Sequence, residues 1–153
     1  MKLRKFLPSD KAEFLSMCKD FYGPSGATLH PISEEQMESS FDQAVAGNPY
    51  IVGYIMEVEG ETAGYGLIYP FYSNEAGGLC LMLEEIYVKP AYRCHKLGTQ
   101  YLNEIAGVFG GNVTTLKLEI CPANPRARKL YESMGFHELG YTSMVKEVQV
   151  SSK

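Results

Sequence analysis

Residues 83–99 read LEEIYVKPAYRCHKLGT, which predicts a strand that passes through a tight loop into a helix. The strand ends at Pro90, because proline has no amide hydrogen to donate to a sheet. The helix begins at about Leu97, and Gly98 allows a close backbone approach. Such a turn points several unpaired N–H groups at one spot, where the helix dipole adds positive potential. The stretch therefore predicts a pyrophosphate site, with an ordinary packed connection as the alternative.

A second informative stretch, NPRARKLYESMGF, spans residues 124–136. An Asn cap, Pro at the first helical position and Gly135 at the expected left-handed end predict a short helix. One face of this helix carries three apolar residues and one phenol: Ala127, Leu130, Tyr131 and Met134. From the residues alone, Tyr131 is either a core tyrosine with a satisfied hydroxyl or a functional group.

The rest of the chain alternates between helical and strand periodicity. Strands are expected at 3–6, 50–58, 62–72, 79–88, 114–121, 136–139 and 141–148, and helices at 9–21, 33–47, 97–109 and 124–134. The second of these helices opens with a capping box, Ser33 and Gln36. This order predicts one α/β (α+β) domain over residues 1–153, with a mixed, mostly antiparallel sheet of about six to seven strands flanked by about four helices.

Composition and charge exclude several classes of protein. The 153 residues are 45% hydrophobic and 21% charged, a globular balance, and the net charge is −4. An acidic chain argues against a broad nucleic-acid surface, and no apolar run approaches the roughly 20 residues of a membrane span. Four scattered cysteines and three dispersed histidines predict no metal site. The expected location is the cytoplasm, where thiols stay reduced.

The two stretches together resemble the GCN5-related N-acetyltransferase (GNAT) superfamily. The acyl-CoA loop of that family reads Arg/Gln-x-x-Gly-x-Gly/Ala, and residues 93–98 read RCHKLG. The second family motif, Asn-x-x-Ala-x-x-x-Tyr-x-x-x-Gly-Phe, fits residues 124–136 at every fixed position. The middle glycine of the loop is Lys96 here. A glycine-only backbone would make Lys96 strain the loop, whereas a helical backbone would let it add a cation near the phosphates.

The resemblance implies acetyl-CoA as co-substrate. It places the contacts of the pantetheine arm on the exposed backbone of Ile86, Tyr87 and Val88, where a strand N–H can polarise the thioester carbonyl. It places the pyrophosphate at the loop and helix start, which comprise Arg93, Cys94, His95, Lys96, Leu97, Gly98 and Thr99. Asn124 and Ala127 complete the predicted cofactor site, and Arg126, Arg128 and Lys129 are either contacts for the 3′-phosphate or plain surface charges.

The resemblance also assigns the chemistry. Residues 83–88 are similar to the Leu-Glu-Asp strand of polyamine acetyltransferases, which makes Glu84 the candidate base and Glu85 the contact for the amine. Successive strand residues point to opposite faces, so only one of the two glutamates faces the cleft unless a bulge intervenes. Tyr131 is the candidate acid that protonates the CoA thiolate, because a phenol is protonated at neutral pH.

The acceptor is expected between residues 21–32 and 65–72. Tyr22, Tyr69 and Tyr72, with Phe71, are candidates for an aromatic wall that suits a cationic small amine or polyamine; a simple core role is the alternative. A protein N-terminus, a lysine side chain or an aminoglycoside remain alternative acceptors, and a non-catalytic acyl-CoA-binding module is an alternative function. A dinucleotide-binding domain is excluded, because its glycine-rich motif and parallel sheet are missing. Dimers are common among relatives, so a homodimer stays open.

Overall fold

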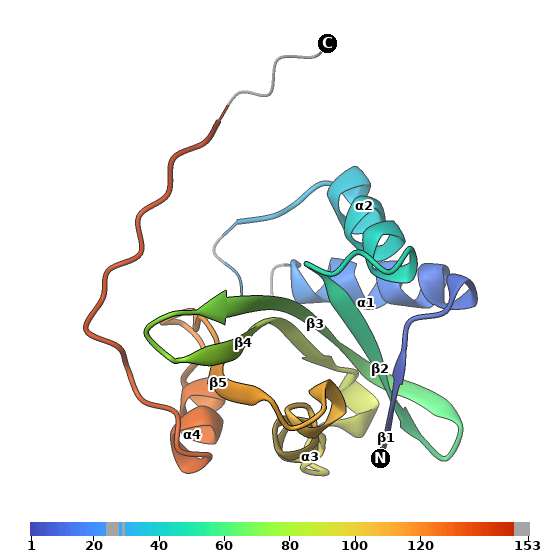
Figure 1. Ribbon diagram of the computed structural model, residues 1–153. Helices are drawn as coiled ribbons and strands as arrows, with labels where there is room; N and C mark the ends of the chain where they lie inside the picture. The colour runs from blue at the N-terminus through green and yellow to red at the C-terminus, as the bar shows by residue number, and fades with distance from the viewer. Residues whose placement is uncertain (24–27, 29, 149–153) are drawn as a thin grey trace.

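The computed structural model describes residues 1–23, 28 and 30–148, which form a twisted sheet covered by helices on both faces (Figure 1). The strands are β1 (Lys2–Lys5), β2 (Val52–Val58), β3 (Glu61–Ser73), β4 (Gly78–Val88) and β5 (Val113–Lys117). The helices are α1 (Lys11–Phe21), α2 (Glu34–Val45), α3 (Leu97–Glu104) and α4 (Pro125–Ser133), with short 3-10 turns at Pro8–Asp10, Pro90–Tyr92 and Gly107–Phe109. The strand order is β1-β2-β3-β4-β5, antiparallel except for the parallel pair β4–β5, which confirms the predicted mixed sheet.

Two apolar cores lie on opposite faces of this sheet. The helices α1 and α2 cover one face, where the Phe14 ring packs against both Phe41 and Tyr65. The helix α3 covers the other face, where Tyr101 and Ile105 are fully buried. Figure 1 shows α1 and α2 on one side of the strands and α3 and α4 on the other. Both faces of the central strands are therefore buried, which explains their nearly continuous apolar sequence.

A bulge at Glu84 changes which face of β4 each residue occupies. Leu83 pairs with Ile68, and Glu85 pairs with the adjacent Leu67, so Glu84 is the extra residue on β4. Leu83 lies in the α3 core, whereas Tyr87 lies in the α1 core. Without the bulge these two residues, four apart, would share one face. The bulge therefore turns Glu85 and Tyr87 toward α1.

The parallel strands β4 and β5 separate at the level of this bulge. Their pairing runs from Leu79–Val113 to Met82–Lys117. Within the described residues, the part of β4 from 83 to 88 pairs with β3 alone. The other edge of this part of β4 is consequently free to bind a ligand through its backbone.

The predicted elements differ from the structure mainly at the C-terminal end. The helix expected at 97–109 ends at Glu104 and continues only as a separate 3-10 turn, and the strand expected at 114–121 ends at Lys117. The prediction of strands at 136–139 and 141–148 is wrong, because neither stretch pairs with another strand among the described residues. Alternating sequence gives a strand only where a neighbouring strand supplies hydrogen bonds. The sheet therefore has five strands where six to seven were expected.

Candidate functional site

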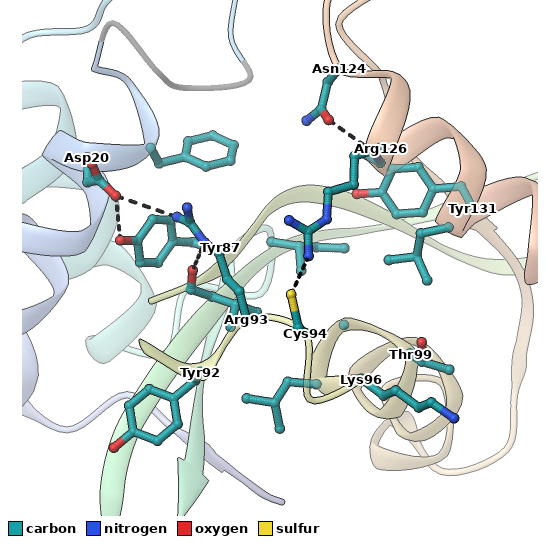
Figure 2. A pocket seen from close by; sticks show the side chains of 17 residues that line it. Asp20, Tyr87, Tyr92, Arg93, Cys94, Lys96, Thr99, Asn124, Arg126 and Tyr131 are labelled. Carbon is teal, nitrogen blue, oxygen red and sulfur yellow. Dashed lines mark hydrogen bonds and ion pairs between the residues drawn. The ribbon is translucent and has the colours of Figure 1, made fainter. Parts of the chain in front are cut away.

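The free edge of β4 opens into a pocket of about 550 Å³ (Figure 2). The end of α1, the last residues of β4, the loop before α3 and the start of α4 form its walls. It is lined by all the predicted cofactor-site residues except His95, which is exposed: Ile86, Tyr87, Val88, Arg93, Cys94, Lys96, Leu97, Gly98, Thr99, Asn124 and Ala127. Tyr131 lines the same pocket. The two motifs, about thirty residues apart in sequence, are thus neighbours in space.

The loop before α3 has an unusual backbone. Cys94 and Lys96 have φ of 69° and 60°, which is the left-handed region. Lys96 is the cap of α3, so its backbone is left-handed and not helical. Side chains other than Gly, Asn and Asp adopt this region at a cost of about 1–2 kcal/mol. Lys96, which stands where the family loop has its middle glycine, therefore has a strained backbone. Its side chain points away from Arg126 and Asn124 in Figure 2.

The start of α3 offers donors to a ligand. The first N–H of this helix with a backbone acceptor is that of Gln100, 3.0 Å from the Lys96 carbonyl oxygen. In the described part of the chain, the N–H groups of residues 96–99 have no backbone acceptor. Gly98 lets α3 approach α4 closely, because a Cβ there would lie 3.2 Å from Leu130 Cδ2. Unpaired N–H groups at a helix start fit an anionic group such as a phosphate.

An arginine and an aspartate join the two walls of the pocket. Arg93 donates from Nε to the Val88 carbonyl oxygen at 2.8 Å and lies over the Tyr87 ring. The Tyr87 hydroxyl donates to Asp20 Oδ2 at 2.5 Å, and the same carboxylate lies 3.7 Å from the Arg93 guanidinium. Burial, together with the contact with Asp20, raises the pKa of Tyr87 to about 12. Figure 2 shows this chain of contacts between α1 and the loop.

The opposite wall is formed by α4. Asn124 caps this helix, since its side-chain oxygen accepts the Ala127 N–H at 3.0 Å, as predicted. Arg126 reaches across the pocket and donates to Cys94 Sγ at 3.2 Å. The Tyr131 hydroxyl points into the pocket in Figure 2. Partial burial raises the pKa of Tyr131, so the phenol keeps its proton at neutral pH.

Glu85 lies outside this pocket, in a buried cluster on the α1 side of β4. Only 4% of its surface is exposed. Its carboxylate accepts from the hydroxyls of Tyr22 at 2.7 Å and Tyr65 at 2.5 Å, with the Cys18 thiol at 3.8 Å. Desolvation raises the pKa of Glu85, although the three donors oppose this effect. Burial together with the negative charge of Glu85 raises the pKa of Cys18 to about 12.

Glu84 and Tyr69 lie close enough to this cluster for the charge of Glu85 to raise the pKa of each. Glu84 is more than a third exposed, and partial desolvation, with the charges of Glu85 and Glu119, raises its pKa. Desolvation and both glutamates raise the pKa of Tyr69. Tyr72 is 75% exposed, and Phe71 lies under Lys117, so neither joins the group. Of the predicted aromatic wall, the structure brings together Tyr22 and Tyr69 only.

Sequence reasoning missed several residues of the pocket. They are Asp20, Phe21, Tyr92 and Leu130. Asp20 and Phe21 close α1, some 70 residues before the loop that they face, and no local pattern indicates such a contact. Of the candidate phosphate ligands on α4, Arg126 lines the pocket, whereas Arg128 forms ion pairs with Glu138 and Glu132. Part of the predicted acceptor segment, residues 24–27 and 29, lies outside the described residues.

The chain matches the family model described as "Acetyltransferase (GNAT) family" over residues 15–136. The chain belongs to the GNAT acetyltransferase family. This confirms the family and the class, an acetyltransferase, expected from the two motifs. Within the described residues, no helix is long and apolar enough to cross a membrane, and no cluster of three His, Cys, Asp or Glu could hold a metal.

Several N-acetyltransferases are similar to this chain. The thialysine N-epsilon-acetyltransferase of Bos taurus is 32% identical over 114 residues, which cover 71% of this chain and 66% of that protein. The uncharacterized N-acetyltransferase YhfO of Bacillus subtilis is 28% identical and covers 90% of this chain and 91% of its own length. The chain thus spans slightly less than two thirds of the mammalian relative.

Solved structures share the fold. A possible acetyltransferase from Clostridium difficile 630 has a TM-score of 0.82 at 15% identity, and the match covers 97% of this chain and 98% of that one. The aminoglycoside acetyltransferase AAC(6')-Iy, in complex with a bisubstrate analogue built on CoA, has a TM-score of 0.75 at 14% identity, with 97% and 98% covered. These matches confirm the predicted fold class, apart from the smaller number of strands.

Proposed function

We propose that this chain is an acetyl-CoA-dependent N-acetyltransferase that acetylates a primary amine. The observation that carries the proposal is the pocket itself, which is lined together by the start of α3, with its unpaired N–H groups, by the free edge of β4 and by Tyr131. In a chain whose net charge is −4, the free N–H groups and the dipole of α3 supply local positive potential for an anionic ligand. Acetyl-CoA, when bound, supplies a thioester whose carbonyl carbon is open to attack by an amine.

The loop and helix start bind the phosphates in this proposal. The N–H groups of residues 96–99 donate to the pyrophosphate, and the α3 dipole favours its negative charge. Arg126 and Arg93 add two guanidinium groups at the same pocket. The free edge of residues 86–88 pairs with the amides of the pantetheine arm, and an N–H of this edge polarises the thioester carbonyl.

Tyr131 acts as the general acid. Its raised pKa keeps the phenol protonated, so that the hydroxyl can protonate the departing thiolate. Its place at the end of the pocket, on the capped helix α4, gives it a fixed orientation. Removal of the hydroxyl should therefore slow turnover without weakening CoA binding.

In this proposal, Glu84 deprotonates the amine and Glu85 attracts it. An alkylammonium must lose a proton before it attacks, and Glu84, which is accessible and has a raised pKa, suits the general base. Glu85 is fixed by Tyr22 and Tyr65 and supplies a negative charge that attracts the ammonium. Tyr22 and Tyr69 contribute aromatic surface beside that charge. A small amine or polyamine is the acceptor that this arrangement favours, and the similarity to a thialysine acetyltransferase supports it.

An acceptor panel tests the proposal directly. Release of the CoA thiol is followed with acetyl-CoA and a set of polyamines, thialysine, aminoglycosides and lysine or N-terminal peptides. Cys94 is exposed and would react with a thiol reagent, so the assay uses Cys94→Ser as a second enzyme preparation. Turnover with small polyamines and little with peptides is expected. CoA binding without release of thiol from any amine would favour the non-catalytic module.

A further inference from the structure

Arg93 is held against the free edge of β4 by three contacts. Its Nε donates to the Val88 carbonyl oxygen at 2.8 Å. Its guanidinium lies over the Tyr87 ring, 5.6 Å from the centroid, and its Nη2 is 3.7 Å from Asp20 Oδ2. Figure 2 shows the guanidinium pointing toward Asp20 and Tyr87. The charged group of Arg93 is therefore engaged with other groups of the protein.

The carbonyl that Arg93 contacts lies on the free edge of β4. The C=O and N–H of one trans peptide point in opposite directions. The N–H that shares a peptide with the Val88 carbonyl is that of Lys89, and it donates to the Ala63 carbonyl oxygen on β3 at 2.9 Å. The Val88 carbonyl consequently points away from β3, to the edge that has no strand partner among the described residues. A ligand that pairs with this edge competes with Arg93 for the carbonyl and for the space around it.

Asp20 supplies the negative charge beside Arg93. It is the only one of the described residues lining the pocket that carries a carboxylate. Its Oδ2 accepts the Tyr87 hydroxyl at 2.5 Å, which fixes the carboxylate at the end of α1. A negative charge is unfavourable in a pocket for an anionic ligand unless it has another role. Its contact with the guanidinium provides that role.

The second arginine of the pocket is held less firmly. Arg126 donates to the Cys94 sulfur at 3.2 Å, and in the described part of the chain it forms no ion pair with a carboxylate. A neutral sulfur is a weak acceptor. Arg126 can therefore turn to an anionic ligand at little cost, whereas Arg93 must first leave a carboxylate and a carbonyl.

We propose that Arg93 occupies the place of the cofactor on the free edge of β4 until the cofactor binds, and that Asp20 is the positioning residue that holds it there. When the pantetheine arm pairs with residues 86–88, the guanidinium leaves the Val88 carbonyl and turns to the pyrophosphate. The contacts that are broken lower the apparent affinity, because only molecules in which Arg93 has moved can bind. Asp20 therefore limits how tightly the pocket holds its ligand. The identity of this ligand, acetyl-CoA, rests on the proposed function.

Asp20→Asn tests this role through a gain of affinity. Asparagine keeps an oxygen for the Tyr87 hydroxyl but lacks the charge that holds Arg93. The Kd for CoA, measured by isothermal titration calorimetry, should fall about 2- to 5-fold, the contribution of an exposed ion pair. Glu104→Gln removes the same charge from the exposed end of α3, outside the pocket. This control should keep the wild-type Kd, because salt screens exposed charges.

A double-mutant cycle separates the proposed role from simple repulsion. Loss of a negative charge would tighten the binding of an anionic ligand even if Arg93 did not move. In an Arg93→Gln background there is no guanidinium to hold, so Asp20→Asn should add no further affinity. The family loop motif has Gln as well as Arg at this position, which makes the background variant a mild one. An equal gain in both backgrounds would refute the role of Asp20.

A crystal structure of the CoA complex shows directly where the guanidinium goes. Arg93 Nε should have left the Val88 carbonyl oxygen, and an amide of the pantetheine arm should have taken its place. If Arg93 still donated to this carbonyl in the complex, the displacement would be disproved and the proposed function would stand. If calorimetry detected no binding of CoA at all, the displacement and the proposed cofactor would both fail.

Discussion

The pocket at the start of α3 and the cluster around Glu85 lie on two sides of the same strand, yet they are made in opposite ways. The pocket combines free backbone N–H groups, which any sequence with this loop would present, with the guanidinium groups of Arg93 and Arg126. The cluster obtains its negative charge from one carboxylate that needs hydroxyl groups from α1 and β3. A backbone site tolerates substitutions, whereas a side-chain site depends on each partner. Variants should therefore affect the two regions separately.

The largest effect is expected from Tyr131→Phe. It should lower turnover by about 10²–10⁴, the usual contribution of general acid catalysis, and leave the Kd for CoA unchanged. Steady-state kinetics and calorimetric titration with CoA measure the two quantities. Tyr50→Phe, at a tyrosine that is 75% exposed and outside both regions, is the control. Unchanged turnover in Tyr131→Phe would remove this residue from the mechanism.

Glu85→Gln should lower the catalytic efficiency with the acceptor amine and leave CoA binding unchanged. A hydrogen bond to a charged group contributes about 1.5–3 kcal/mol, so kcat/KM for the amine should fall roughly 10- to 100-fold. The Kd for CoA should stay within a factor of two or so, because the N–H groups at α3 are untouched. Glu59→Gln, in the exposed turn between β2 and β3, serves as the control. A matching loss of CoA affinity would show that the two regions are not independent.

The same variant should change how stability depends on pH. The pKa of Glu85 is raised in the folded protein, so the folded state keeps this proton over a pH range in which the unfolded chain has lost it. The free energy of unfolding should consequently fall as pH rises from about 4.3, the ordinary value for glutamate, through the raised pKa. Urea denaturation of both proteins between pH 4.5 and 7 gives the comparison. Glu85→Gln should lack this contribution, and parallel curves would contradict the prediction.

The smallest effect is expected from the loop itself. Lys96→Gly should raise the free energy of unfolding by about 1 kcal/mol, because glycine adopts the left-handed backbone without strain. CoA affinity should be kept, since the donors there are N–H groups. Lys129→Gly, in the exposed middle of α4, should lower stability by about 0.5–1 kcal/mol, the cost of glycine inside a helix. A loss of stability in Lys96→Gly would mean that the lysine side chain supports the loop.

Local sequence patterns predicted where the elements around the pocket begin and end. The cap at Asn124, the left-handed Gly135 and the break at Pro90 each depend on neighbours within a few residues, and the structure has all three features. The capping box of α2 is also present, with Ser33 and Gln36 bonded in both directions. Features of this kind are fixed by backbone chemistry and need no information on tertiary contacts.

Features that depend on distant partners could not be predicted. The bulge at Glu84 arises from the register between β3 and β4, which no pattern in either strand reveals. The contact of Asp20 with Tyr87 depends on where α1 ends relative to the sheet. The strands predicted at 136–139 and 141–148 also failed for lack of a distant partner. Their residues alternate as in a strand, but in the described residues no neighbouring strand pairs with them.

The one-residue insertion in β4 has a consequence for how this region can vary. In a regular strand Glu84 would lie opposite Leu67, and every residue after it would change face. Glu85 would then point into the apolar core around Tyr101 and Ile105, and Ile86 would face the hydroxyls of Tyr22 and Tyr65. Deleting Glu84, by contrast, would leave Glu85 opposite Leu67 and keep the faces of the residues that follow, so the extra residue can be lost without reversing the strand.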